Sequence, residues 1–322
     1  MPIMPLHPLD KIEIFTLLDN YTDLTVMDNN DVITRGGYPQ YGGLKQPLRA
    51  EHGFSLLIHS CRGSEVGSMV FDGGFSPAGA VENVNKLGLN LKDVESFVLS
   101  HGHADHWGGL KGLLKATGQN RMPLVVHPDA FRRFRHSLNK TLVYHMPPLT
   151  RRRLANAGFD LQETRVPSLI LRGNVLFLGE VPRIHDFEKN ESDSYYRENG
   201  LTKRDDFLDD SAVTMLLKGK GLIIITGCAH AGIINTIEQA IRLTGEKRIF
   251  AIMGGFHFTG KTKAQILPIL DALHQFHPCY IVPCHCTGRE ATRWIEEAMP
   301  EAFLLNMSGT KFTFHGCDDR EG

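Results

Sequence analysis

The stretch that decides the fold is Ser100-His101-Gly102-His103-Ala104-Asp105-His106-Trp107-Gly108-Gly109. It follows an apolar, strand-like run over residues 94–100 and places four good metal ligands within six positions. Imidazole and carboxylate groups at this density are typical of a metal-binding turn, because several of them can reach one cation. A polar surface turn is the alternative interpretation. We favour the metal-binding turn.

The spacing of these ligands predicts two neighbouring metal positions. If the chain stays extended through His103, then His101 and His103 point to the same side, because strand side chains repeat every two residues. Asp105 and His106 follow the end of this alternation, where the turn directs them to an adjacent position. Two cations about 3.5 to 4 Å apart share a water and lower its pKa. These ligands fit zinc best, with iron or manganese as alternatives.

The composition describes an ordinary globular protein of 322 residues, with 42% hydrophobic and 22% charged residues. Its 35 Lys and Arg balance 36 Asp and Glu, so no basic field favours a nucleic acid as partner. Residues 1–20 lack the pattern of a secretory leader, and no run of about 18 uncharged apolar residues occurs. We therefore expect a cytoplasmic protein without membrane association. The six cysteines form no repeated pairs and are expected to be reduced thiols.

Short apolar runs alternate with longer amphipathic stretches along the chain. Runs such as 94–100 and 222–226 suit buried strands, whereas 233–243 and 263–275 suit helices. This mixture predicts an α/β fold in which two mixed β-sheets are sandwiched between helices. We expect one domain over residues 1–322.

Two long insertions break this rhythm, near residues 129–166 and 183–210. They are interpreted as lids or binding loops, or alternatively as solvated surface elaborations. The first is rich in arginine, which would hold a substrate phosphate if the loop folded over the site. These arginines are residues 132, 133, 135 and 151–153.

Two metal positions that keep room for water and substrate need more than four ligands, so later strand ends must supply them. His230 follows the run 222–226 and precedes a predicted helix. His285 follows the run 280–283 in the same way. We expect both to be metal ligands, together with His101, His103, Asp105 and His106.

Other residues near these strand ends have alternative roles. His257, which follows a double glycine, is a metal ligand or a substrate contact. Cys228 supplies a thiolate ligand or is a buried inert thiol. Cys284 and Cys286 flank His285 and are expected to point away from the metal, since an extended chain alternates its side chains.

Three carboxylates complete the candidate set. We expect Asp105 to orient the nucleophile as well as bind metal. Asp72 ends an apolar run and is expected to assist catalysis, either by a hydrogen bond to a ligand imidazole or from a place near the metal-bound water; a turn cap is the alternative. Glu180 is a metal ligand, a partner of a ligand, or the ion-pair partner of Arg183.

The chain resembles the metallo-β-lactamase superfamily in Phe71-Asp72-Gly73-Gly74, in the motif over 100–106 and in the isolated histidines 230 and 285. Longer stretches resemble the subgroup named for the dihydropterin ribofuranosyl-aminobenzene phosphate synthase of methanogens. They are Ala50-Glu51-His52-Gly53-Phe54-Ser55, Gly179-Glu180-Val181-Pro182-Arg183, Thr226-Gly227-Cys228-Ala229-His230, Gly254-Gly255-Phe256-His257 and Pro283-Cys284-His285-Cys286-Thr287-Gly288. The resemblance spans about Lys11 to Gly309.

The resemblance implies an αββα sandwich with a dinuclear metal site at one edge of the sheets and mostly hydrolytic chemistry. Members of the superfamily usually carry a strand-end aspartate that bridges the two metals. This chain has no Gly-Asp after its late strands. Either Cys228, His230 or Glu180 takes the bridging role, or that role is empty.

These observations together predict a metal-dependent hydrolase of a small ester, phosphoester or lactone, in which a hydroxide activated by two divalent metals attacks the substrate. The expected partner is a small molecule, with a phosphorylated one as an option, and an oligomer is compatible with the sequence. One alternative is a transferase of the kind that names the subgroup. Another is a non-catalytic metal-dependent binding or sensing module.

Overall fold

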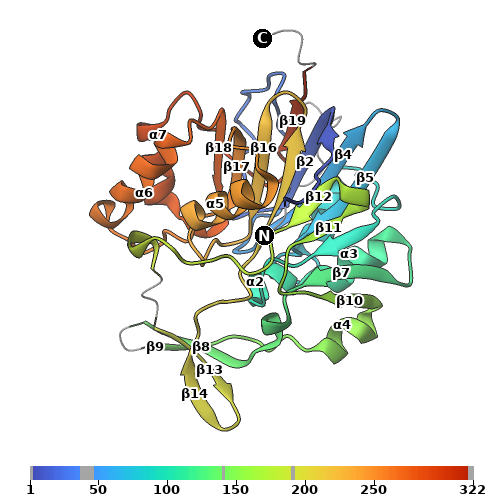
Figure 1. Ribbon diagram of the computed structural model, residues 1–322. Helices are drawn as coiled ribbons and strands as arrows, with labels where there is room; N and C mark the ends of the chain where they lie inside the picture. Colours follow the sequence, from blue (N-terminus) through green and yellow to red (C-terminus); the bar gives the residue numbers. More distant parts are fainter. Residues whose placement is uncertain (1–2, 37–46, 140–141, 190–192, 318–322) are drawn as a thin grey trace.

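Two β-sheets pack face to face, and helices cover their outer faces (Figure 1). The computed structural model describes residues 3–36, 47–139, 142–189 and 193–317. Within those ranges, no helix is both long and apolar enough to cross a membrane.

The first sheet has eight strands in the order β10-β7-β6-β5-β4-β2-β19-β3. Strands β5, β6, β7 and β10 run parallel, so their carboxyl ends meet at one edge of the sheet. The strand bounds are β2 Lys11–Leu18, β3 Ile33–Thr34, β4 Ser55–Arg62, β5 Glu65–Phe71, β6 Ser96–Val98, β7 Met122–Val126, β10 Phe159–Glu163 and β19 Lys311–His315.

The second sheet has seven strands, in the order β11-β12-β15-β16-β17-β18 with β1 paired to β15. Strands β16, β17 and β18 are parallel, and all six residues of β16 are buried, as its apolar sequence GLIIIT requires. The strand bounds are β1 Pro8–Leu9, β11 Ser168–Ile170, β12 Val175–Phe177, β15 Ala212–Leu217, β16 Gly221–Thr226, β17 Ile249–Gly255 and β18 Tyr280–Cys284.

Three apolar layers hold the sheets and helices together. One lies between the two sheets and includes Phe71 and Ile225. The second packs α1, α3 and α4 on the first sheet, and the third packs α5, α6 and α7 on the second sheet. The predicted α/β sandwich is therefore confirmed. The helix bounds are α1 Gly79–Lys86, α2 Ala104–Trp107, α3 Leu110–Thr117, α4 Arg151–Ala157, α5 Ile233–Thr244, α6 Lys263–Gln275 and α7 Arg289–Ala298.

A small third sheet of order β14-β13-β8-β9 lies below the sandwich in Figure 1. Its strands are β8 Arg133–Asn139, β9 Leu142–His145, β13 Ser194–Glu198 and β14 Leu201–Arg204. The two stretches that the sequence marks as separate insertions thus pair with each other through β8 and β13, because each hairpin needs a partner for its open edge. Within 129–166, however, β10 belongs to the first sheet, where it pairs with β7.

Candidate metal centre

The predicted ligands gather where parallel strands of both sheets end. His101, His103, Asp105 and His106 lie between β6 and the end of α2. Cys228 and His230 follow β16, and His285 begins the 3-10 helix η4, His285–Thr287, directly after β18. Carboxyl ends of parallel strands are where open α/β sheets usually bind ligands.

His101, His103 and His230 form the first donor group. Their ligand nitrogens lie within 4.8 Å of one another, and all three residues are buried. The Nε2 atoms of His101 and His103 and both ring nitrogens of His230 have no hydrogen-bond partner among the described residues. Burial lowers the pKa of His103 to about 3 and the pKa of His101 and His230 well below its usual range. The rings are therefore neutral, as metal binding requires.

Asp105, His106 and His285 form the second donor group. The Asp105 Oδ2 atom lies 3.1 Å from His285 Nε2 and 3.7 Å from His106 Nε2. Exposed His52 approaches the same oxygen at 3.4 Å. Burial raises the pKa of Asp105, but the charges of His106 and His285 hold it well below the usual range. This carboxylate is thus ionised and ready to bind a cation.

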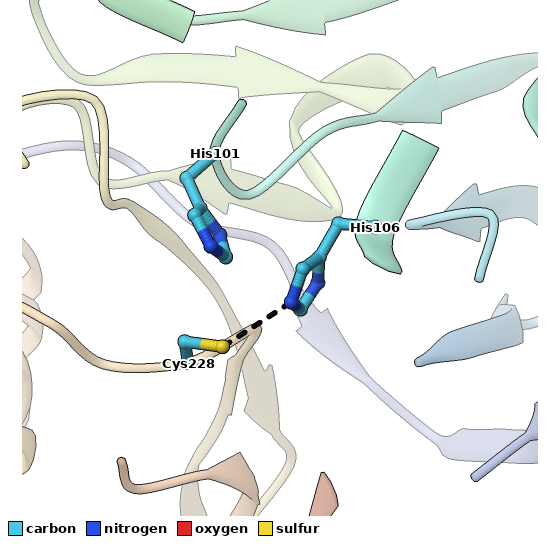
Figure 2. A group of neighbouring side chains, drawn as sticks. All are labelled: His101, His106 and Cys228. Atoms are coloured by element: carbon cyan, nitrogen blue, oxygen red, sulfur yellow. Dashed lines mark hydrogen bonds between the residues drawn. The ribbon is translucent and has the colours of Figure 1, made fainter. Parts of the chain in front are cut away.

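Cys228 connects the two donor groups. Its Sγ atom lies 3.2 Å from His106 Nε2, and it shares a group of possible ligand atoms with His101 and His106. Figure 2 shows the three side chains pointing toward one another, with Cys228 coming from the second sheet and both histidines from the first. Cys228, His230 and Glu180 were the residues considered for a bridging ligand. Cys228 lies close to a member of each donor group, His101 of the first and His106 of the second.

Asp72 lies behind this centre rather than in it. The residue is fully buried, and its Oδ2 atom accepts a hydrogen bond of 2.6 Å from His106 Nδ1 and one of 2.7 Å from the Ser100 hydroxyl. Burial lowers the pKa of His106, but Asp105 and Asp72 raise it to about 9, so a cation bound at Nε2 would displace a proton from this ring. Asp72 therefore fixes the orientation of a ligand ring, the task that outer carboxylates perform in metal sites.

Gly227 makes this close meeting of the two sheets sterically feasible. A Cβ atom on Gly227 would lie 2.1 Å from the Ser100 Oγ atom and 3.0 Å from Asp72 Oδ2. Only glycine therefore lets the turn after β16 approach the histidine loop of the first sheet.

A buried ion-pair network supports the histidine loop from the side of the third sheet. Arg135, in β8, donates to Asp209 at 2.6 and 2.9 Å and lies 2.8 Å from Asp205. Asp209 Oδ2 also accepts the Gly102 backbone N–H at 2.8 Å. The aspartates belong to a conspicuous acidic run over 205–210, a signal that our reading of the sequence did not use.

Phe207, from the same acidic run, covers the first donor group. Its ring stacks on that of His230 with centroids 4.3 Å apart and meets His103 edge-on. Arg183 holds the loop by donating to the carbonyl oxygens of Asp206 and Phe207. This aromatic cap is a second element that sequence reasoning missed.

Glu180 belongs to none of the groups of possible ligand atoms found among the described residues. Glu180 accepts hydrogen bonds from His127 Nε2 at 3.1 Å and Arg165 at 2.7 Å. Several of the six arginines already have partners: Arg132 and Arg135 pair with aspartates, and Arg151 pairs with Glu163. These three would have to share their N–H donors between the carboxylates and a substrate phosphate, so a phosphate-holding arginine cluster stays a prediction.

Cys286 also departs from its expected position. Its Sγ atom lies within 4.8 Å of donor atoms of Cys228 and His257, so it points toward the centre. The expected alternation fails because His285 has a left-handed backbone, with φ 48°, and begins a 3-10 turn. Cys284 does point away, as expected, and its thiol donates to the Val282 carbonyl.

The donor chemistry of these residues fits divalent metal ions. Buried imidazole nitrogens without partners, an ionised carboxylate and a thiol converge within metal-ligand reach of one another. Such an unpartnered polar cluster would be costly unless a cation satisfied it.

The sequence and the fold are similar to those of known proteins. A family model of the metallo-β-lactamase superfamily matches residues 50–231. The 7,8-dihydropterin-6-methyl-4-(β-D-ribofuranosyl)-aminobenzene-5'-phosphate synthase of Methanocaldococcus jannaschii is 28% identical over 313 residues, which are 94% of this chain and 96% of that protein. An uncharacterized protein of the same organism is 32% identical over 244 residues, 75% of this chain and 86% of its own.

A solved structure described as a metal-dependent hydrolase of the β-lactamase superfamily has the same fold. It superposes with a TM-score of 0.70 at 23% identity and covers 93% of this chain and 98% of its own. The sequence match, the sandwich and the strand-end donors lead to one conclusion: the chain belongs to the metallo-β-lactamase superfamily.

Proposed function

We propose that the chain is a hydrolase of a small ester, phosphoester or lactone that uses two divalent metal ions, with zinc as the best fit to its donors. The observation that carries this proposal is the gathering of donors around Cys228 and Asp105. Cys228 groups with His101 and His106, and Asp105 lies close to His106 and His285. A preference for zinc follows from the mixture of imidazole, carboxylate and thiolate.

Each donor group would hold one ion. His101, His103 and His230 supply three imidazoles to the first, and Asp105, His106 and His285 supply the donors of the second. Cys228 is the proposed shared ligand, in place of the aspartate that the superfamily usually carries. Two ions so held act as Lewis acids and lower the pKa of a coordinated water toward neutrality.

Two carboxylates, Asp105 and Asp72, have different roles in the proposed centre. The side chain of Asp105 is 15% exposed, whereas those of His106 and His285 are fully buried, so Asp105 is the donor of its group that faces incoming water and orients it. Asp72 has no exposed surface and acts as a positioning residue through His106. Its hydrogen bond to a ligand imidazole is one of the two placements expected for Asp72 from the sequence.

A cavity of about 690 Å³ beside His285 supports a small substrate. This size lies within the range of about 300 to 1,000 Å³ that small-molecule sites occupy. Exposed Arg289, at the first turn of α7, lies in its wall and would favour a substrate with an anionic group.

Hydrolysis assays on the full chain test the proposal. Phosphodiester, phosphomonoester and lactone panels are measured with native, metal-stripped and zinc-reloaded protein. We expect activity that disappears on stripping, returns on reloading and is lost in His101→Ala. His274→Ala is the matched control, because His274 is exposed on α6, away from the donors. Turnover that survives complete metal removal would overturn the proposal.

A synthase reaction is the second candidate, favoured by the named relative that aligns over 94% of this chain. It predicts that the chain joins a pterin to a phosphorylated ribosyl-aminobenzene with release of diphosphate. Chromatography of the reaction mixture distinguishes the candidates, because the product is larger than either substrate. Failure to form this product while the hydrolysis panel responds excludes it.

A further inference from the structure

Three side chains form a further donor group outside the two described above. Cys228, His257 and Cys286 have donor atoms that all lie within 4.8 Å of one another. They follow the ends of three adjacent parallel strands, β16, β17 and β18. Both cysteines are buried, with 3% and 6% of their surface exposed.

Gly255 makes the approach of the two thiols sterically feasible. A Cβ atom at this position would lie 2.6 Å from the Cys286 Sγ atom and 2.4 Å from the Gly227 carbonyl oxygen. Any other residue would therefore push Cys286 away from Cys228.

The backbone around the group is held in an uncommon conformation. Ala229, His257 and His285 all have positive φ, at 51°, 51° and 48°. Such a conformation costs on the order of 1 kcal/mol for a residue other than glycine and persists where the surroundings enforce it. All three positions adjoin the donor group, and the turn at His285 is what directs Cys286 inward.

The polar atoms of the group are only partly satisfied: Cys228 Sγ contacts His106 Nε2 at 3.2 Å, whereas other atoms lack strong partners. The Nδ1 atom of His257 is buried without a hydrogen bond among the described residues. The Cys286 thiol contacts the Cys228 carbonyl oxygen at 3.7 Å, a weak interaction. An inert buried cysteine normally packs among apolar side chains, whereas this one faces a thiol and an imidazole.

We propose that Cys228, His257 and Cys286 form a thiolate-rich metal subsite that takes a soft divalent cation such as zinc. The inference rests on the proposed function, because Cys228 is also the proposed shared ligand next to His101 and His106. Two sulfur donors and one imidazole select zinc or iron over manganese or magnesium. On binding, each thiol releases its proton to water and no oxidant or reductant is needed.

Sulfur counting tests this subsite directly. The full chain is loaded with zinc, and the number of sulfur atoms at about 2.3 Å from zinc is measured by X-ray absorption, together with the metal content per chain. We expect sulfur ligands from both Cys228 and Cys286 in the native protein. In Cys286→Ser we expect a lower average number of sulfur ligands per zinc and the loss of one zinc per chain.

Cys284→Ser is the matched control, since Cys284 flanks His285 on the other side and its thiol donates to Val282. It should keep both sulfur ligands and the full metal content. His257→Gln is a second test that spares both thiols, and it should also lose one zinc per chain. Circular dichroism establishes that each variant is folded.

The outcomes separate the subsite from the proposed function. Zinc bound with the same sulfur count in native protein and Cys286→Ser refutes the subsite and leaves the hydrolase proposal standing. A Cys228–Cys286 disulfide in the loaded protein, seen as a mass lower by two hydrogens, also refutes it. A native chain that binds no zinc refutes both.

Discussion

The Nε2 atom of His106 lies 3.2 Å from the Sγ atom of Cys228, so a thiol of the second sheet meets a histidine of the first. The superfamily resemblance implies an aspartate as the ligand between two metals, and the thiol has the position to replace it. A thiolate is softer than a carboxylate and favours zinc or iron over manganese.

Replacing this thiol tests its role as the shared ligand. Cys228→Ala should weaken zinc binding at least about tenfold, because it removes a donor common to both groups, whereas Cys228→Asp should retain more affinity than Cys228→Ala. Competition with a chromogenic chelator measures both. Cys279→Ser, at an exposed cysteine, is the control and should match the native protein. Equal affinity in Cys228→Ala and the native chain would contradict the assignment.

Asp72→Asn tests the orientation of His106. The amide keeps the size of the side chain but loses the negative charge that holds the ring nitrogen at 2.6 Å. We expect zinc affinity to fall about 10- to 100-fold with the fold intact. Chelator competition and circular dichroism report the two effects separately. Asp271→Asn, at an exposed position of α6, should leave zinc affinity unchanged. An equal loss of zinc affinity in Asp271→Asn would exclude a specific role for Asp72.

Arg135→Leu tests the ion-pair network that supports the histidine loop. The Arg135 side chain is 4% exposed and its partner Asp209 is fully buried, so the variant leaves buried carboxylates without a counter-charge. Unfolding by urea should show a loss of about 3 to 5 kcal/mol. Arg121→Leu removes an ion pair whose arginine is 78% exposed and should cost less than about 1 kcal/mol. Similar losses in both variants would mean that the network is unimportant.

Glu188 gives a prediction for pH. It lies in the 3-10 helix η3, Asp186–Glu188, and accepts the N–H groups of Ile234 and Asn235 at the start of α5. Burial raises its pKa from 4.5 to about 7, against the opposing effect of these hydrogen bonds. Between these values the folded state binds more protons than the unfolded chain, so the free energy of unfolding falls as pH rises through this window and levels off above it.

Urea unfolding of the native chain and Glu188→Gln at about pH 5 and about pH 8 measures this effect, since the amide cannot titrate. The native chain should lose more stability than the variant over this interval. The comparison is repeated in a His185→Asn background, because the charge of His185 also acts on Glu188. Parallel pH profiles in both backgrounds would rule out the effect.

The donors of the centre were predictable from sequence because most follow the end of a strand, while Asp105 and His106 lie in the short helix α2 of the same motif. Alternation along an extended chain places His101 and His103 on the same side. The strands that precede His230 and His285 are parallel, so their carboxyl ends converge at one edge of the sheet. The support of these donors was not predictable. Arg135 and Asp209 are 74 residues apart, and their pairing depends on two hairpins that meet only in the folded molecule.

Cys286 shows the other limit of sequence reasoning. Its inward direction depends on a single left-handed residue, His285, at a position where alternation predicts the opposite. The composition of the turn does not single out that residue, because positive φ is uncommon for residues other than glycine. Here Asp19 accepts the His285 N–H at 2.9 Å and Asn20 donates to its carbonyl oxygen at 3.1 Å, so contacts distant in sequence hold the conformation.

The donors also have a mechanical consequence, because they come from both sheets. An ion held by His106 of the first sheet and Cys228 of the second ties together two points 122 residues apart in the chain. Such an ion acts as a removable cross-link across the seam of the sandwich. Each tenfold rise of the free metal concentration above the dissociation constant then adds about 1.4 kcal/mol per ion to the free energy of unfolding. The concentration of free metal would thus set how stable the folded chain is.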